Sequence, residues 1–396
     1  MNSYRGKVLN GRGELIGWGL ELDNDGAVLE VKPVDAAGEG EPEGWIIPGL
    51  IDIHCHGGGG ASFPDATTED EVHTAIAAHR NLGTTGMIAS LVSMIDPLPQ
   101  IKLLASFCER GELLGIHLEG PYVSLAHVGA QNPAAVRNPN LDELRTWLEA
   151  GKGWIKTMTI APELPGAKEA AQLLLDYGAL PSWGHTDATM MQTRESEKAT
   201  WQYAQQIEYP RVPQTATHLF NGMPLMAHRE PGPVRELVQA ARRGEVVVEL
   251  IADGVHVNLD LVGDVVNYVQ DAGDGLGLAL ITDAMAAAGL SDGSYELGGL
   301  PVTVKGGVAT LTQGSSIAGG TSRLVEQLQR TVFAGVLTLA QGVRAAVAAP
   351  AKLLGLSDET PGVSVEFTAG QLANFIALNE SLDIQTVVRE GAAVKA

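Results

Sequence analysis

Two histidines follow an apolar run early in the chain. The run over 45–53 has the pattern of a buried strand, and it leads directly into His54, Cys55 and His56. Side chains alternate faces along a strand, so His54 and His56 project from the same side and can bind one metal ion together. Two histidines that are only hydrogen-bonded in the core or at the surface have the same spacing, so the pair alone leaves both interpretations open.

Further side chains of the metal-binding kind follow other apolar runs downstream. They are Glu119, Glu163, His185, His218, Asp253, His256 and Asp283. Each has an ordinary alternative: Glu119 as a solvated loop acid, His185 as a helix-entry residue, His218 as a satisfied core histidine. Their repetition at successive run ends favours a metal centre, and a set of histidines and carboxylates suits borderline cations such as zinc or iron(II).

Residues in and around this set have expected roles other than metal binding. Asp283 follows the strongly apolar run 276–281, where an unpaired carboxylate is costly. A divalent cation makes water more acidic and needs a nearby base to accept its proton, and Asp283 is our candidate for that base. If the substrate is an anion, Arg229 and His256 are the best cationic donors. Cys55 points away from its histidine neighbours, so we expect a packed core thiol.

These residues need a scaffold that brings the ends of the runs together. Short apolar runs alternate with amphipathic helical stretches, which is typical of βα units. The runs cover 45–53, 85–91, 113–118, 155–160, 179–183, 214–217, 246–251 and 276–281, and helices are expected over 69–82, 97–110, 167–177, 188–205, 233–243 and 259–270. The fold class we predict is α/β, with a (β/α)8 barrel over 45–344 whose carboxyl strand ends form one rim.

The two ends of the chain have a different pattern. Short β-like pieces occur at 5–9, 15–22 and 27–34, and again at 362–366, 373–378, 384–388 and 392–395. We expect 1–44 and 345–396 to form one small β-sandwich domain. Glycine-punctuated pieces over 291–313 predict a hairpin or two inserted after the eighth strand, followed by helices over 322–339 and 341–354.

Composition excludes several classes of protein. Of the 396 residues, 45% are hydrophobic and 18% are charged, which is incompatible with a disordered chain. No apolar run is long enough to span a bilayer, and the N-terminus lacks a signal-peptide core, so we expect a cytoplasmic protein that binds no membrane. Two cysteines, Cys55 and Cys108, agree with a reducing compartment. The formal charge of −21 argues against a nucleic-acid partner.

The order of the motifs resembles that of the amidohydrolase superfamily and, within it, of the N-acetylglucosamine-6-phosphate deacetylase family. The motifs that carry the resemblance are Pro48-Gly-Leu-Ile-Asp-Ile-His-Cys-His-Gly57, His117-Leu-Glu-Gly-Pro121, Ala161-Pro-Glu163, Gly184-His-Thr-Asp-Ala188, Thr217-His-Leu-Phe-Asn-Gly-Met223, Arg229-Glu-Pro-Gly232, Ile251-Ala-Asp-Gly-Val-His256 and Thr282-Asp-Ala-Met285. The resemblance covers essentially the whole chain. It implies hydrolysis of the acetamido group of N-acetyl-D-glucosamine 6-phosphate, in amino-sugar catabolism and cell-wall recycling.

The resemblance also implies a role for each site residue. The main metal would be held by Glu119, His185 and His218, and a second metal by His54, His56 and the shared Glu119; zinc or iron is expected, one or two per chain. Asp283 would accept the proton of the attacking water and pass it to the leaving amine. The sugar and phosphate would be held by Asn221, Gly222, Arg229 and His256, with Arg229 and His256 reaching across from the partner in a homodimer.

One position departs from the family pattern. Gln131 stands where the family usually has a histidine that polarises the substrate carbonyl, and an amide can donate a hydrogen bond but has no positive charge. The sequence therefore leaves two alternatives open: an amidohydrolase acting on a related N-acyl amino sugar or a cyclic amide, and a sugar-phosphate binding protein without activity. The intact set of Glu119, His185, His218 and Asp283 argues against the second.

Overall fold

Eight parallel strands form the centre of the protein, in the order in which they occur in the chain. The structure, a computed structural model, describes residues 2–34 and 40–395. The strands are β5 (Leu50–Cys55), β8 (Thr84–Leu91), β9 (Gly115–Glu119), β10 (Ile155–Ile160), β11 (Leu180–Trp183), β12 (Thr215–Ala216), β13 (Val247–Ile251) and β14 (Leu278–Ile281). Cys55, the last residue of β5, pairs with Ala284, which follows β14, and this pairing closes the sheet into a barrel. The predicted (β/α)8 barrel is confirmed.

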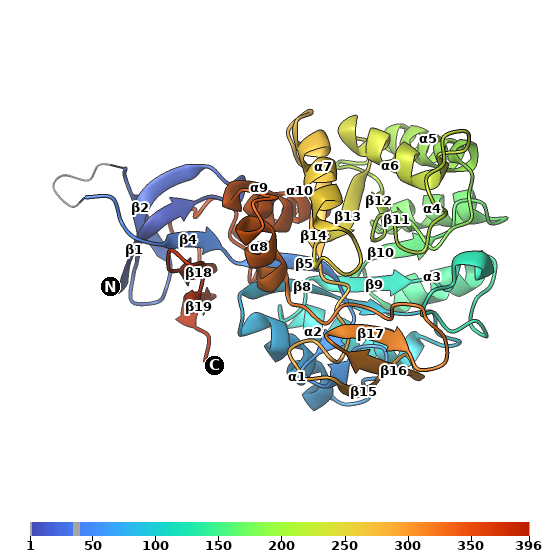
Figure 1. The fold of residues 1–396 in the computed structure, drawn as a ribbon, viewed down its shortest axis with the longest axis horizontal. Coiled ribbons are helices and arrows are strands. Elements are labelled where there is room, and N and C mark those ends of the chain that lie inside the picture. The colour runs from blue at the N-terminus through green and yellow to red at the C-terminus, as the bar shows by residue number, and fades with distance from the viewer. Residues whose placement is uncertain (1, 35–39, 396) are drawn as a thin grey trace.

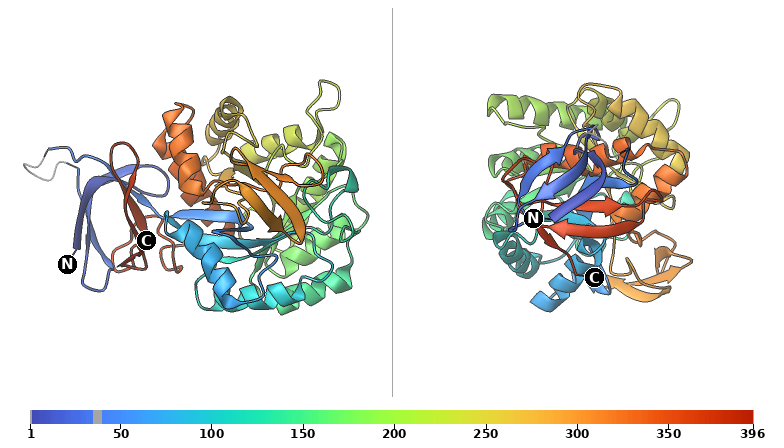
Figure 2. Two further views of the ribbon diagram at one scale, coloured as in Figure 1. Left: turned by 60° about the horizontal axis from the view of Figure 1, so that its bottom comes forward. Right: turned by 90° about the vertical axis from the view of Figure 1, so that its left-hand side faces the viewer.

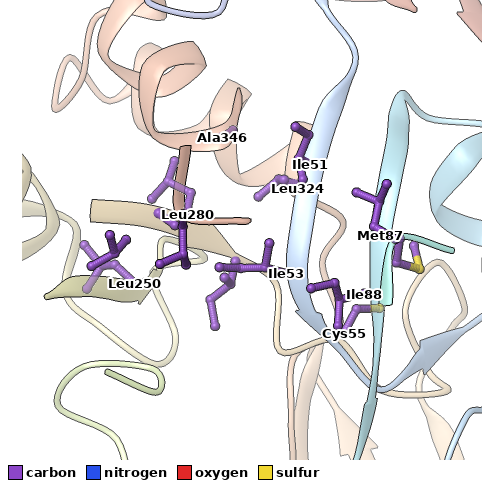
Figure 3. Packing of buried hydrophobic residues seen from close by; sticks show 14 of the residues in the cluster. Ile51, Ile53, Cys55, Met87, Ile88, Leu250, Leu280, Leu324 and Ala346 are labelled. Atoms are coloured by element: carbon purple, nitrogen blue, oxygen red, sulfur yellow. The ribbon is translucent and has the colours of Figure 1, made fainter. Parts of the chain in front are cut away.

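Helices surround the barrel strands (Figure 1). They are α1 (Glu69–Arg80), α2 (Leu98–Glu109), α3 (Leu141–Ala150), α4 (Ala167–Asp176), α5 (Met190–Gln206), α6 (Gly232–Arg242), α7 (Leu259–Gln270) and α8 (Leu324–Phe333). Apolar side chains of strands and helices, among them Ile51, Leu280, Leu324 and Ala346, form one large core (Figure 3). Cys55 belongs to this core and is fully buried, as predicted. No helix within the described residues has the length and apolar character needed to cross a membrane.

Both chain ends meet in a second, smaller sheet (Figures 1 and 2). Its order is β20 (Ala392–Ala393), β19 (Ile384–Arg389), β18 (Phe375–Leu378), β4 (Trp45–Pro48), β1 (Asn2–Leu9), β2 (Leu15–Leu22) and β3 (Val28–Lys32). Backbone hydrogen bonds join Val28 to Gln371 and Gly26 to Ala373, so this single sheet folds back on itself rather than forming two separate layers. The predicted β domain from both termini is confirmed; residues 1, 35–39 and 396 of its expected range lie outside the described residues.

Two predicted strands are wrong. The apolar run over 45–53 is not one strand: Trp45–Pro48 pairs with the small sheet, and the barrel strand β5 begins only at Leu50. Gly49 separates them at a position where a Cβ atom would lie 2.0 Å from the Thr85 hydroxyl, so the crossing between the two sheets has no room for a side chain. The segment 362–366 forms turns and bends, where Asp358 accepts backbone N–H groups of Val365 and Glu366.

After β14 the chain makes a three-stranded sheet before it reaches α8. The strands are β15 (Gly293–Leu297), β16 (Leu300–Lys305) and β17 (Val308–Leu311), which agrees with the predicted insertion. Figure 2 (left) shows this sheet, in orange, set against the barrel. After α8, the helical segments α9 (Leu339–Val343), Arg344–Ala348 and α10 (Ala349–Leu354) follow one another without a break.

Candidate active site

One carboxylate lies at the centre of the barrel rim, with a pair of histidines at each of its oxygens. Glu119, the last residue of β9, places Oε1 2.8 Å from Nε2 of both His185 and His218. Its Oε2 lies 3.1 Å from Nε2 of His56 and 3.9 Å from that of His54. All five side chains are buried. Glu119 therefore can bridge two cation positions, one between each pair of histidines.

The spacing within each histidine pair fits metal ligation. The two Nε2 atoms of His54 and His56 are 3.2 Å apart, and those of His185 and His218 are also 3.2 Å apart. Two nitrogens bound to one tetrahedral zinc ion at about 2.0–2.1 Å are separated by about 3.3 Å. Within each set the donor atoms lie within 4.8 Å of one another, and Asp283 belongs to the set that contains His54 and His56. This chain's residues thus fit a divalent cation at either position.

The outer nitrogens of three of the four histidines are held by acceptors, which fixes the tautomers of these rings. Nδ1 of His54 contacts Glu249 at 2.9 Å, that of His56 contacts the Ser90 carbonyl at 3.1 Å, and that of His185 contacts the His127 carbonyl at 2.8 Å. A proton on Nδ1 leaves the Nε2 lone pair free to face a cation. Nδ1 of His218 is buried and has no partner within residues 2–34 and 40–395.

Backbone conformation aims three of these side chains. His185, His218 and Asp283 have φ values of 47°, 26° and 50°, in the left-handed region that non-glycine residues seldom occupy. Such conformations cost free energy and are retained at functional sites when the surrounding fold enforces them. Here they turn the chain sharply where β11, β12 and β14 end.

Asp283 lies beside the His54/His56 pair. Its Oδ1 is 3.2 Å from Nε2 of His56 and 3.5 Å from that of His54. Burial disfavours the charged carboxylate, but the contact with His56 and the charge of His54 outweigh it and lower the pKa of Asp283 to about 2. Burial also opposes a charged His56, yet Asp283 and Glu119 raise its pKa to about 9. Asp283 is therefore ionised at neutral pH and able to accept a proton.

Gln131 is buried at the same site and is also part of the wall of the pocket described below. Its Nε2 donates to Glu119 Oε2 at 2.7 Å, and its Oε1 accepts from the Ser93 backbone N–H at 2.5 Å. Because the Ser93 N–H can only donate, the amide oxygen of Gln131 must face it, and this fixes the orientation of the amide. Both ends of the Gln131 amide are thus engaged with the protein, and it holds Glu119 in place.

A pocket of about 310 Å³ opens above the cation positions. Its wall includes Asn221, Gly222 and His256, three of the residues predicted to bind substrate. The inserted three-stranded sheet and the segment after it also contribute to the wall, through Leu297 and Ile317. Sequence reasoning missed this contribution, because Leu297 and Ile317 are apolar and do not mark the insertion as part of a site.

Two predicted substrate-binding cations lie in different surroundings. His256 lines the pocket from its own chain, held by Asp253 at 2.8 Å, and its pKa is raised because Asp253 outweighs the effect of burial. His256 thus faces the pocket of its own chain, and its contribution across a subunit interface stays a prediction. Arg229 is exposed, does not line the pocket, and has no hydrogen-bond or ion-pair partner in the described part of the chain.

Two strand-end acids do not join the cation positions. Glu163 accepts hydrogen bonds from the Thr186 hydroxyl and the Asp187 backbone, so it holds the loop after β11. Asp253 holds His256. In contrast, Glu249 on β13 touches His54 and was not identified from the sequence, although an acid within the apolar run 246–251 was a visible signal.

Comparison with known proteins agrees with this arrangement. The amidohydrolase family matches residues 45–177. The chain is 33% identical over 320 residues to N-acetylglucosamine-6-phosphate deacetylase of Bacillus subtilis, covering 76% of this chain and 75% of the relative. It is 29% identical to N-acetylgalactosamine-6-phosphate deacetylase of Escherichia coli, covering 93% and 92%. A structure of N-acetyl-D-glucosamine-6-phosphate deacetylase from Mycobacterium smegmatis, a mutant in complex with N-acetyl-D-glucosamine-6-phosphate, matches at 36% identity with a TM-score of 0.86, covering 99% of this chain and 98% of that chain.

Proposed function

This chain belongs to the N-acetylglucosamine-6-phosphate deacetylase family of amidohydrolases, and we propose from this premise that it hydrolyses N-acetyl-D-glucosamine 6-phosphate. Water adds to the acetyl carbon, the bond from that carbon to the amide nitrogen breaks, and glucosamine 6-phosphate and acetate leave. The observation that carries the proposal is Glu119, placed with one oxygen toward each histidine pair and with Asp283 alongside.

We infer that the cations are zinc or iron(II), which accept histidine and carboxylate ligands. Glu119, His185 and His218 would hold one, and His54, His56 and Glu119 the other. A divalent cation bound there polarises a carbonyl oxygen and makes water more acidic.

Asp283 is proposed as the group that moves the proton. Its Oδ1 accepts a proton from the attacking water and returns it to the amide nitrogen, so that the amine can leave. Two observations support this role: the carboxylate is ionised at neutral pH, and it lines the pocket beside the cation positions.

The remaining pocket residues are proposed to bind the sugar phosphate. Asn221, the Gly222 backbone and His256 face the pocket of their own chain. We assign one amide N–H of Gln131 to holding Glu119, while its second N–H is left to donate to the acetyl carbonyl.

A homodimer is part of the proposal. Arg229 lies on the loop between β12 and α6, where Leu225 and Met226 are 93% and 62% exposed. A partner subunit that covers these apolar side chains would receive Arg229 near its own pocket, as a cation for the phosphate. We also place the enzyme in the cytoplasm, which agrees with two cysteines that are both buried and unpaired.

Acetate release by protein of known metal content tests the proposal. We expect turnover of N-acetylglucosamine 6-phosphate and little turnover of the unphosphorylated sugar. The second candidate substrate is the C4 epimer, N-acetylgalactosamine 6-phosphate, because the Escherichia coli relative is named as a deacetylase of that compound. A higher kcat/KM for the epimer would shift the assignment to it, and no acetate from either sugar phosphate at full metal loading would overturn the proposal.

A further inference from the structure

Glu249 is a carboxylate with no solvent exposure in the middle of β13. Its neighbours Val248 and Leu250 are apolar, and all of them are buried. It does not line the pocket. A buried carboxylate is costly unless it is paired and hydrogen-bonded, so its contacts indicate what it does.

The carboxylate contacts one histidine from each pair. Oε2 of Glu249 is 2.9 Å from Nδ1 of His54 and accepts the backbone N–H of His218 at 3.3 Å. The backbone carbonyl of Glu249 accepts the N–H of Leu219 at 2.8 Å. Oε1 is buried and has no partner among the described residues. The side-chain contacts of Glu249 among the described residues are therefore directed at the cation-binding histidines.

The three tautomer-fixing contacts at this site are not equivalent. His56 and His185 face neutral backbone carbonyls at Nδ1, whereas His54 faces a carboxylate. A hydrogen bond to an ionised acceptor is about twice as strong as one between neutral groups. It also increases electron density on the ring, which makes Nε2 a better donor to a cation.

We propose that Glu249 is a positioning residue that sets the tautomer and orientation of His54 and so determines whether the His54/His56 position binds a cation. Glu249 touches neither the pocket nor the reacting atoms, and it acts through His54. The inference rests on the proposed function only in that both positions take divalent cations.

The test is a zinc titration of metal-free protein by calorimetry, with metal counts after dialysis. Two substitutions grade the effect. Glu249→Gln keeps the shape and an acceptor but removes the charge, and Glu249→Leu removes the acceptor. We expect one of the two zinc-binding events to weaken about tenfold in the first variant and about a hundredfold in the second, while the other event stays unchanged.

Two further variants separate positioning from general stability. Glu236→Gln removes another buried carboxylate, on α6, which contacts Arg194 rather than the site, and it should leave both zinc-binding events unchanged. In the Glu249→Gln, His54→Ala double variant, the loss of zinc affinity should be no larger than in His54→Ala alone, because the His54 ring is the ligand side chain that the Glu249 carboxylate contacts, and Gln keeps an oxygen for the His218 backbone N–H.

Wild-type affinity for two zinc ions in both Glu249 variants would overturn the inference. Equal weakening of both events together with a lower Tm would overturn it as well, since that is the signature of a structural role. Failure of the deacetylase proposal is distinguishable: a wild-type protein that binds two zinc ions and releases no acetate would defeat that proposal and leave the zinc result for Glu249 intact.

Discussion

Replacing Asp283 by Asn removes the proposed proton acceptor with little change in shape. Asp283 has a φ of 50°, and Asn is among the few residues that tolerate this region. The backbone N–H of Asp283 bonds the His54 carbonyl at 2.9 Å, and its carbonyl accepts from Gly320 at 2.6 Å. Both bonds are made by the main chain, so we expect the variant to fold.

The expected loss of kcat has two sources, the loss of the general base and the loss of a negative charge beside the cation position. A general base contributes about 10²–10⁴-fold to kcat, which is about 3–5 kcal/mol of activation free energy. Oδ1 also lies 3.2 Å from His56 Nε2, so the cation at that position loses a neighbouring negative charge. The cation between His185 and His218 is served by the other Glu119 oxygen and should remain bound.

The assay is acetate release in a single turnover, on protein whose metal content is measured in the same sample. Asp187→Asn is the matched control, since this aspartate follows β11 with its side chain 59% exposed and contacts His127. The control should keep kcat within a factor of about three, a change of under 1 kcal/mol. If Asp283→Asn with wild-type metal content keeps kcat within tenfold, Asp283 is not the base.

Three further expectations concern other parts of the chain. Gln131→Asn shortens the side chain so that it no longer spans Ser93 and Glu119, and kcat and cation affinity should fall about tenfold; unchanged zinc titration curves would contradict this role. Arg229→Ala should raise KM for the phosphorylated sugar at least tenfold with kcat kept, and an equal effect on the unphosphorylated sugar would refute phosphate binding. Burial and Glu245 raise the pKa of Glu197 to about 8, so between about pH 4.5 and 8 the folded state holds a proton that the unfolded state has lost, and stability falls as pH rises across this range. Glu197→Gln should therefore raise Tm at pH 8.5 and leave it unchanged at pH 4, whereas an unchanged Tm at both would show that Glu197 is ionised in the fold.

The sequence was sufficient for the barrel and for the residues at its rim. Apolar runs ending in His54, Glu119, His185 or Asp283 repeat at βα spacing, and parallel strands bring such ends together whatever the loops do. Each apolar run and the polar residue at its end are neighbours in the sequence, and the barrel repeats this arrangement at every strand. It explains why the structure brings these side chains within ligand distance of one another.

What could not be predicted depends on contacts between distant segments. The interruption at Gly49 separates two sheets within one continuous apolar run, and only the pairing with β18 reveals it. Gln131 lines the pocket as expected, but its orientation depends on Ser93, 38 residues away, whose backbone N–H donates to Oε1 and so leaves the amide nitrogen facing Glu119. The family resemblance implied that His256 reaches across a subunit interface; in the structure it lines the pocket of its own chain, where Asp253 holds it.

The junction between the first and last barrel strands has a kinetic consequence. His54 and Asp283 are joined there by a backbone hydrogen bond, and His56 bonds the Ala284 carbonyl at 2.7 Å. A growing chain that ends at β13 already contains both histidine pairs and Glu119, yet it lacks the strand that closes the ring. Contacts so distant in sequence form late in folding. A cation held by His54, His56 and Asp283 would stabilise the closed barrel, because its third ligand, Asp283, reaches the two histidines only once the last strand has paired with the first.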